Sequence, residues 1–227
     1  MSLKEFKKSL NGEGVEGELV KTIFVSFITS VATLGLLYFL KLKQVENFIP
    51  KYGFFVFFSI LSFAVLIPAI KQVRAYKEFP CMSGMMIGMT IGMISGFLPA
   101  FYVGSTNGMF WGSTMGMVTG IYFGISNGKC CGTMGIMEGI MAGFMGSLMG
   151  AMTAVMTLND NLKYLGIIVF IVSAIVMLGL NYMIFRESAH LERKIKEGQF
   201  YTITTTFIFT IVIVWLIVYG PRSTLFT

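Results

Sequence analysis

Methionines recur at helical spacing in two segments of this chain. One segment carries Met82, Met85, Met89 and Met93, and the other carries Met134, Met137, Met141, Met145, Met149, Met152 and Met156. Residues three and four apart share one face of an α-helix, so each set predicts a stripe of thioethers. A thioether is a soft, neutral ligand that suits Cu(I). The stripes therefore predict a path along which a soft metal ion passes from one sulfur to the next.

Three cysteines stand where these segments begin. Cys81 precedes the first, and Cys130 and Cys131 precede the second in the run NGKCCG. We expect reduced thiols on the cytoplasmic side, with Lys129 favouring the thiolate form, and hence a low-coordinate site at one mouth of the path. The predicted metal ligands are Cys81, Met82, Met85, Met89, Met93, Cys130, Cys131, Met134, Met137, Met141 and Met145.

Both sets of sulfur residues have a simpler interpretation. Methionine is a flexible side chain that fills gaps beside glycine, and cysteine is a small residue often found at helix ends. A chain that uses its sulfur atoms only for packing would bind no metal.

Glu138 is the acidic residue that falls inside a predicted membrane span, and it lies on the methionine stripe. An intramembrane carboxylate is costly and usually faces a cavity or a partner. We expect it to offset the charge of a passing cation or to carry a proton in exchange. The alternative is a carboxyl that reaches the membrane surface or stays protonated.

Glycine occupies every fourth position from Gly84 to Gly132, except that position 100 is Ala. Rows of small residues let helix backbones approach closely in lipid, where no hydrophobic effect draws helices together. The spacing predicts that three consecutive helices pack as a tight glycine-zipper triplet. The predicted packing residues are Gly84, Gly88, Gly92, Gly96, Gly112, Gly116, Gly120, Gly124, Gly135, Gly139 and Gly143.

The elements that carry these residues are membrane helices. The 227 residues are 55% hydrophobic and 12% charged, with a mean hydropathy of +0.77, which few soluble domains reach. Apolar runs long enough to span a bilayer lie at about 22–40, 53–70, 82–103, 109–127, 132–157, 164–185 and 200–219. These runs are continuously apolar, so we expect an all-α polytopic membrane protein with about seven transmembrane helices.

The composition divides the chain into four parts. We expect a cytoplasmic amphipathic leader at 1–21, two ordinary transmembrane helices within 22–79, a Gly/Met-rich three-helix core at 80–157, and two more transmembrane helices within 158–227. Fifteen of the 18 methionines and 17 of the 26 glycines fall in the third part. This part is therefore where we expect the function to lie.

The basic residues predict the orientation. Placing the N-terminus in the cytoplasm puts 12 of the 17 Lys and Arg residues inside and the C-terminus outside, in what we expect to be the plasma membrane. The formal net charge of +6 is then explained by topology and by contact with anionic lipid, not by nucleic-acid binding. No phosphate-binding loop, nucleophile elbow or metalloprotease motif is present, so we do not expect an enzyme.

The Met85–Met89–Met93 series and the glycine rows resemble motifs of the high-affinity copper uptake transporters, whose second span carries MxxxM and whose third carries GxxxG. The resemblance covers only these short motifs, and it implies copper as the cargo. It does not extend to the Met-rich leader of that family, since the leader of this chain contains a single Met.

Three functions fit these patterns. The first is a transporter or channel for a soft metal ion, most simply Cu(I), with a Met-lined path and cytoplasmic cysteines. The second is a non-transporting glycine-zipper scaffold that assembles with copies of itself or with a larger membrane complex. The third is a channel for another small solute. Replacing Met by Leu separates the first from the second, because it removes the sulfur and keeps the volume.

Overall fold

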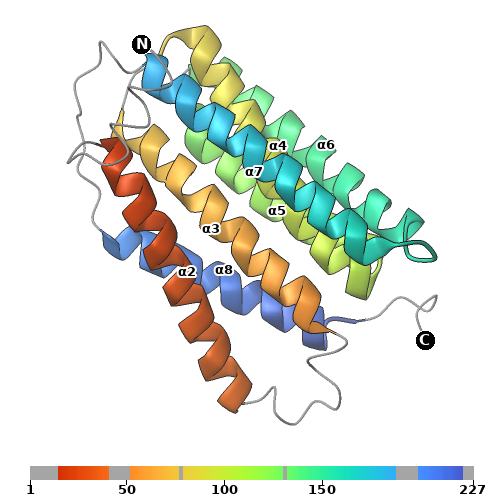
Figure 1. The fold of residues 1–227 in the computed structure, drawn as a ribbon. Coiled ribbons are helices and arrows are strands. Elements are labelled where there is room, and N and C mark those ends of the chain that lie inside the picture. The colour runs from red at the N-terminus through yellow and green to blue at the C-terminus, as the bar shows by residue number, and fades with distance from the viewer. Residues whose placement is uncertain (1–14, 41–51, 77–78, 130–131, 188–198, 222–227) are drawn as a thin grey trace.

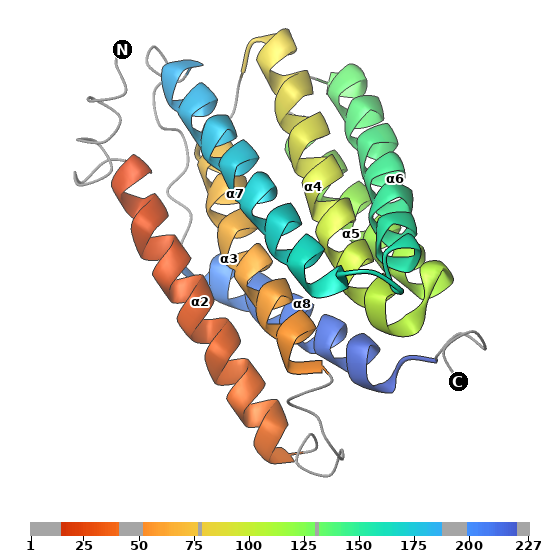
Figure 2. The ribbon, with the colours of Figure 1, turned by 45° about the vertical axis from the view of Figure 1, so that its right-hand side comes forward.

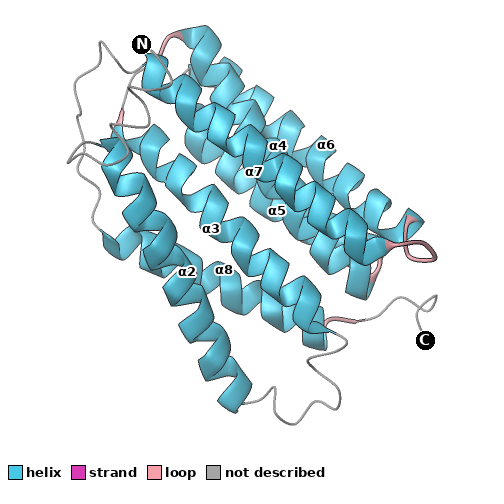
Figure 3. Ribbon diagram, viewed as in Figure 1, coloured by secondary structure: helices cyan, strands magenta, loops and turns pink. Residues whose placement is uncertain are grey.

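The computed structural model describes residues 15–40, 52–76, 79–129, 132–187 and 199–221, and within these ranges it contains helices and no strands (Figure 3). The helices are α2 (Val15–Leu40), α3 (Phe54–Ala75), α4 (Cys81–Asn107), α5 (Met109–Gly128), α6 (Gly132–Met156), α7 (Leu162–Glu187) and α8 (Gln199–Tyr219). Six of them are long and apolar enough to cross a membrane. The expectation of an all-α polytopic membrane protein is confirmed at this level.

The helix that does not qualify as a membrane span is α5. It is 20 residues long, but Ser113, Thr114, Asn127 and five glycines lower its hydropathy. We expected it to be one of seven membrane spans. The structure shows seven helices in the described residues, of which α5 is the least apolar and packs directly against α4 and α6.

Helices α2, α3 and α4 extend beyond their predicted ends. Helix α2 begins at Val15, inside the predicted leader, and α3 continues to Ala75. Lys71 and Arg74, which follow the predicted apolar run at 53–70, therefore lie in α3. Helix α4 continues past the predicted end at residue 103 to Asn107, and the chain reverses at Gly108, whose φ of 93° favours glycine.

Helix α3 lies at the centre of the molecule and is covered on both sides. It contacts α2 and α8 on one side and α4 and α7 on the other (Figures 1 and 2). The buried core joins α3 residues such as Ile67 and Ile70 to Ile87, Ile91 and Leu98 of α4. By contrast, α6 lies at the edge of the bundle. Among the described helices it makes extensive contact only with α4 and α5.

Small residues bring α4, α5 and α6 into backbone contact in successive layers. In one layer, a Cβ added to Gly120 would lie 2.8 Å from Gly96 Cα and 2.9 Å from Gly143 Cα. The same arrangement repeats one helical turn away, where Gly92 and Gly124 both meet Gly139. Each layer therefore takes one small residue from each helix, and a side chain on any of them would push two helices apart.

The layers also define the directions of the three helices. Gly88, Gly92 and Gly96 of α4 face carbonyl oxygens of Gly135, Gly139 and Gly143 of α6, so paired positions are always 47 residues apart. A constant offset means that α4 and α6 run parallel, with α5 antiparallel between them. Gly146 and Gly150 add a second contact row, against the backbone of Met93 and Phe97.

Candidate functional site

The methionines of α6 point away from the rest of the protein. Met134, Met137, Met141, Met145, Met149, Met152 and Met156 are all exposed, with 46–70% of each side chain accessible. On the same helix Gly135, Gly139 and Gly143 are buried. Because the glycine row faces α4 and α5, the methionine stripe faces outward, and the interior of one copy contains no path lined by these residues.

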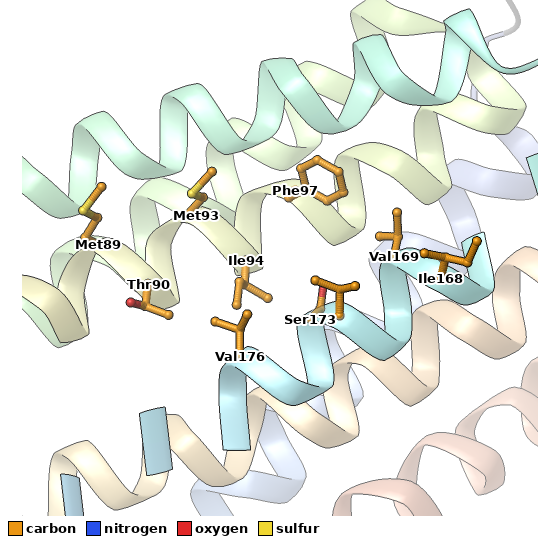
Figure 4. Close-up of a pocket in the computed structure, with 10 residues that line it drawn as sticks. Met89, Thr90, Met93, Ile94, Phe97, Ile168, Val169, Ser173 and Val176 are labelled. Carbon is orange, nitrogen blue, oxygen red and sulfur yellow. The ribbon is translucent and has the colours of Figure 1, made fainter. Parts of the chain in front are cut away.

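The methionines of α4 lie on the surface beside α6. Met82, Met89 and Met93 are exposed, and Met85 is half-buried. Figure 4 shows Met89 and Met93 on the side of α4 that faces the α6 ribbon, whereas Ile94 points toward α7. Together with the α6 stripe they form one surface, which we call the Met face.

The Met face differs in composition from the other outward-facing helices. The large exposed side chains of α7 within the apolar segment are Ile168, Ile171, Val172, Ile175, Val176 and Leu178. Ile, Val and Leu are sufficient for a helix face that contacts only lipid acyl chains. The outward face of α6 instead carries mostly Met, whose side chain is more flexible and bears a sulfur atom.

Of the three cysteines in the predicted thiol site, the structure describes Cys81. Cys81 is exposed at the start of α4 and is disulfide-bonded, so it is not the free thiol that a Cu(I) ligand requires. Cys130 and Cys131 lie outside the described residues, and their part in a metal site stays a prediction. Among the residues that the structure describes, no group of three His, Cys, Asp or Glu residues is placed to hold a metal ion.

Glu138 lies on the Met face, toward the N-terminal end of α6. It is half-buried on α6, with Met134 one turn before it and Met141 one turn after it. No hydrogen bond or ion pair joins its carboxyl to another residue in the described part of the chain. Six residues separate it from the start of α6, which places it about 9 Å along the helix axis.

A groove separates α4 from α7 near the middle of both helices. It has a volume of about 420 Å³, and apolar side chains such as Phe97, Ile168 and Val172 line most of it. The hydroxyl-bearing residues Thr90 and Ser173 line it from opposite helices (Figure 4). The Thr90 hydroxyl donates to the Met86 carbonyl oxygen of its own helix at 2.7 Å.

Polar side chains that the sequence analysis did not single out lie buried around α3. Lys71 Nζ donates to Thr22 Oγ1 of α2 at 3.3 Å, and Gln72 Nε2 donates to the Asn181 carbonyl oxygen of α7 at 3.4 Å. The guanidinium of Arg74 stacks over the Tyr201 ring of α8, 4.3 Å from its centroid. These residues tie α3 to three neighbouring helices.

A row of hydroxyls fills the contact between α2 and α8. Thr22, Ser26 and Ser30 of α2 and Thr202, Thr206 and Thr210 of α8 are all buried, and Ser26 Oγ lies 3.4 Å from Thr206 Oγ1. Both sets recur at every fourth residue, so the sequence carried a signal for this contact. Ser and Thr at that spacing allow close approach and hydrogen bonds between membrane helices.

The fold and these surfaces define a polytopic helical membrane protein with a closely packed glycine-rich unit and an exposed Met face. No family model, curated protein or solved structure matches the chain.

Proposed function

We propose that this chain is a non-transporting membrane scaffold, in which a glycine-zipper triplet of α4, α5 and α6 presents the Met face to a membrane-spanning segment of another protein. The observation that carries the proposal is the difference between the two parallel helices of the triplet. Ile87, Ile91 and Ile94 of α4 are buried in the core, whereas the α6 positions 47 residues further along are Met134, Glu138 and Met141.

Helices α4 and α6 both turn their glycine rows toward the centre of the three-helix unit. Two residues 47 positions apart, one on each helix, therefore lie on equivalent sides of the two helices relative to that centre. On α4, the side that carries Ile87, Ile91 and Ile94 packs into the hydrophobic core, which also includes residues of α3. On α6 the equivalent side is uncovered by any described helix. Methionine suits a docking surface there, because its flexible side chain adapts to different partners.

Photocrosslinking in native membranes tests the proposal. A benzophenone amino acid at Met141 is compared with one at Ile175 of α7, since the two side chains are 64% and 62% exposed. The scaffold function predicts protein adducts from position 141 and only lipid adducts from position 175. Lipid adducts alone from both positions would contradict it.

The thioethers themselves support a second function, the handling of Cu(I) at the Met face. Met137, Met141 and Met145 are spaced one turn apart, so that neighbouring sulfurs are able to share one ion, and Glu138 would offset its charge. The outward direction of the stripe requires that such a path form between this chain and another copy or partner.

A methionine-to-leucine comparison separates the two functions. Replacing Met137, Met141 and Met145 with Leu keeps the apolar volume and removes the sulfur, and Met115→Leu with Met177→Leu makes the same chemical change at buried positions. Handling of Cu(I) predicts that the first variant loses Cu(I) binding under reducing conditions and lowers cellular copper uptake, while the second does neither. If Cu(I) binding and copper uptake are unchanged in both variants, handling of Cu(I) is excluded and the scaffold function is retained.

We expect the protein in the plasma membrane with its N-terminus in the cytoplasm. The start of α2 and the ends of α5 and α7 lie at the same end of the bundle (Figure 1). Exposed basic residues stand near all three: Lys21 in the second turn of α2, Lys129 after α5 and Arg186 in the last turn of α7. Positive residues favour the cytoplasmic side. Glycosylation acceptor tags fused to either terminus test this orientation, since only a tag at the C-terminus is expected to be modified.

A further inference from the structure

We infer that the partner on the Met face is a transmembrane helix carrying a basic side chain at the depth of Glu138. The inference rests on the proposed scaffold function and names the chemistry of its partner. Glu138 is half-buried among exposed methionines, and no described residue of its own chain pairs with it. A carboxylate at membrane depth is stabilised by an opposite charge or a hydrogen-bond donor.

The occupant has the shape of a helix because the equivalent face of α4 already binds helices. Ile87, Ile91 and Leu98 of α4 are no more than 2% exposed, and they pack into the core that includes α3 residues. Met134, Glu138 and Met145 stand at the equivalent α6 positions. A helix packed there would contact α6 as the core helices contact α4, with Glu138 replacing the fully buried Ile91.

A second copy of this chain fits the face less well than a different protein. In a symmetric assembly the rotation axis stands along the membrane normal, so Glu138 of one copy would meet Glu138 of the other at the same depth. Like charges at one depth repel. None of the exposed basic residues in the described part of the chain lies on the Met face: Lys21 is in the second turn of α2, Lys129 follows α5, and Lys163 and Arg186 are in the first and last turns of α7.

Charge complementarity therefore points to a different membrane protein. Its helix presents Lys or Arg to Glu138 and apolar side chains to Met134, Met141 and Met145. The methionines supply adaptable contact area, and the ion pair fixes the depth and register of the partner.

The test uses the full chain in lipid vesicles with synthetic transmembrane peptides as probes. One peptide is a Trp-flanked Leu/Ala helix of about 20 residues with a single Lys about six residues from one end, and its control has Leu at that position. A benzophenone amino acid at Met145 reports docking on the Met face. Each peptide is measured against the parent chain, Glu138→Gln, and Glu187→Gln, which neutralises an acidic residue at the end of α7.

We expect the Lys peptide to crosslink about tenfold more than the Leu peptide in the parent chain and in Glu187→Gln, and equally with it in Glu138→Gln. Equal crosslinking of both peptides to the parent chain overturns the charge pairing but leaves a face that docks helices. A Lys preference that survives Glu138→Gln also overturns it. Efficient crosslinking of two copies of the chain through position 145 assigns the face to self-association and overturns the inference.

Discussion

The Thr119 hydroxyl of α5 lies 3.0 Å from the carbonyl oxygen of Ser95 on α4, slightly closer than to the carbonyl oxygens of Met115 and Gly116 on its own helix, both at 3.1 Å. Pro99 lies four residues after Ser95 and has no N–H, so that carbonyl loses its normal helical donor. In a membrane each backbone acceptor needs an internal partner. The Thr119 hydroxyl supplies one from the neighbouring helix and joins α4 to α5.

Thr119→Val is therefore expected to destabilise the protein by about 1–3 kcal/mol, the cost of leaving a buried acceptor unsatisfied. In a Pro99→Ala background the backbone N–H of residue 99 is restored, and Thr119→Val should cost much less. Thr114→Val is the control, because the exposed Thr114 hydroxyl bonds only to Phe110 of its own helix. Free energies of unfolding in detergent measure all four combinations, and equal costs in both backgrounds would contradict this explanation.

Substitution by Ala is expected to have opposite effects on stability at Gly139 and at Gly179. A Cβ at Gly139 would lie 2.5 Å from the Gly124 carbonyl oxygen, whereas a Cβ at Gly179 of α7 would meet nothing within 4 Å. Gly139→Ala should cost about 1–3 kcal/mol through overpacking. Gly179→Ala should be neutral or stabilise by up to about 1 kcal/mol through helix propensity. Thermal unfolding of the two variants measures the difference, and similar shifts in Tm would argue against backbone contact between α5 and α6.

Gln72 is fully buried, and its side-chain oxygen accepts no hydrogen bond from the described residues. Its one described bond, to the Asn181 carbonyl oxygen, is long at 3.4 Å. Gln72→Met keeps the length of the side chain and removes the unsatisfied acceptor, so we expect a stability within about 1 kcal/mol of the parent or above it.

Gln72→Ala provides the matched comparison, because it removes the same amide but also leaves a cavity. We expect it to cost about 2 kcal/mol or more. Equal destabilisation by Met and Ala at position 72 would show that the amide itself, and not its volume, holds α3 against α7.

The helices of the glycine-rich part, and the glycines on their contact faces, could be predicted from the sequence because both depend on residue spacing. Glycine at every fourth position defines one face of a helix, and Gly88, Gly120 and Gly143 all lie in backbone contacts with a neighbouring helix. The same spacing located the methionine stripe. It did not reveal which way the stripe faces, since periodicity defines a face of a helix and not its neighbour.

The surroundings of a residue could not be predicted from the sequence where they come from distant segments of the chain. The apolar run predicted at 53–70 stops before the charged Lys71, yet α3 continues to Ala75, and the Lys71 ammonium donates to Thr22 of α2, 49 residues earlier in the chain. Likewise, the spacing placed Glu138 on the methionine stripe without revealing which side of the bundle that stripe faces. In the structure Glu138 lies on the outer face of α6, a side that no described helix covers.

The groove between α4 and α7 predicts a position that tolerates added volume. Ser173 lines its wall, and the groove measures about 420 Å³, so a larger side chain has room to enter without moving either helix. Ser173→Leu should change the free energy of unfolding by no more than about 0.5 kcal/mol. Ala154→Leu is the comparison at a fully buried position, where the Ala154 side chain already borders Gly104, and it should cost about 1–3 kcal/mol. A loss of stability at Ser173 as large as that at Ala154 would mean that α4 and α7 close on each other in the membrane.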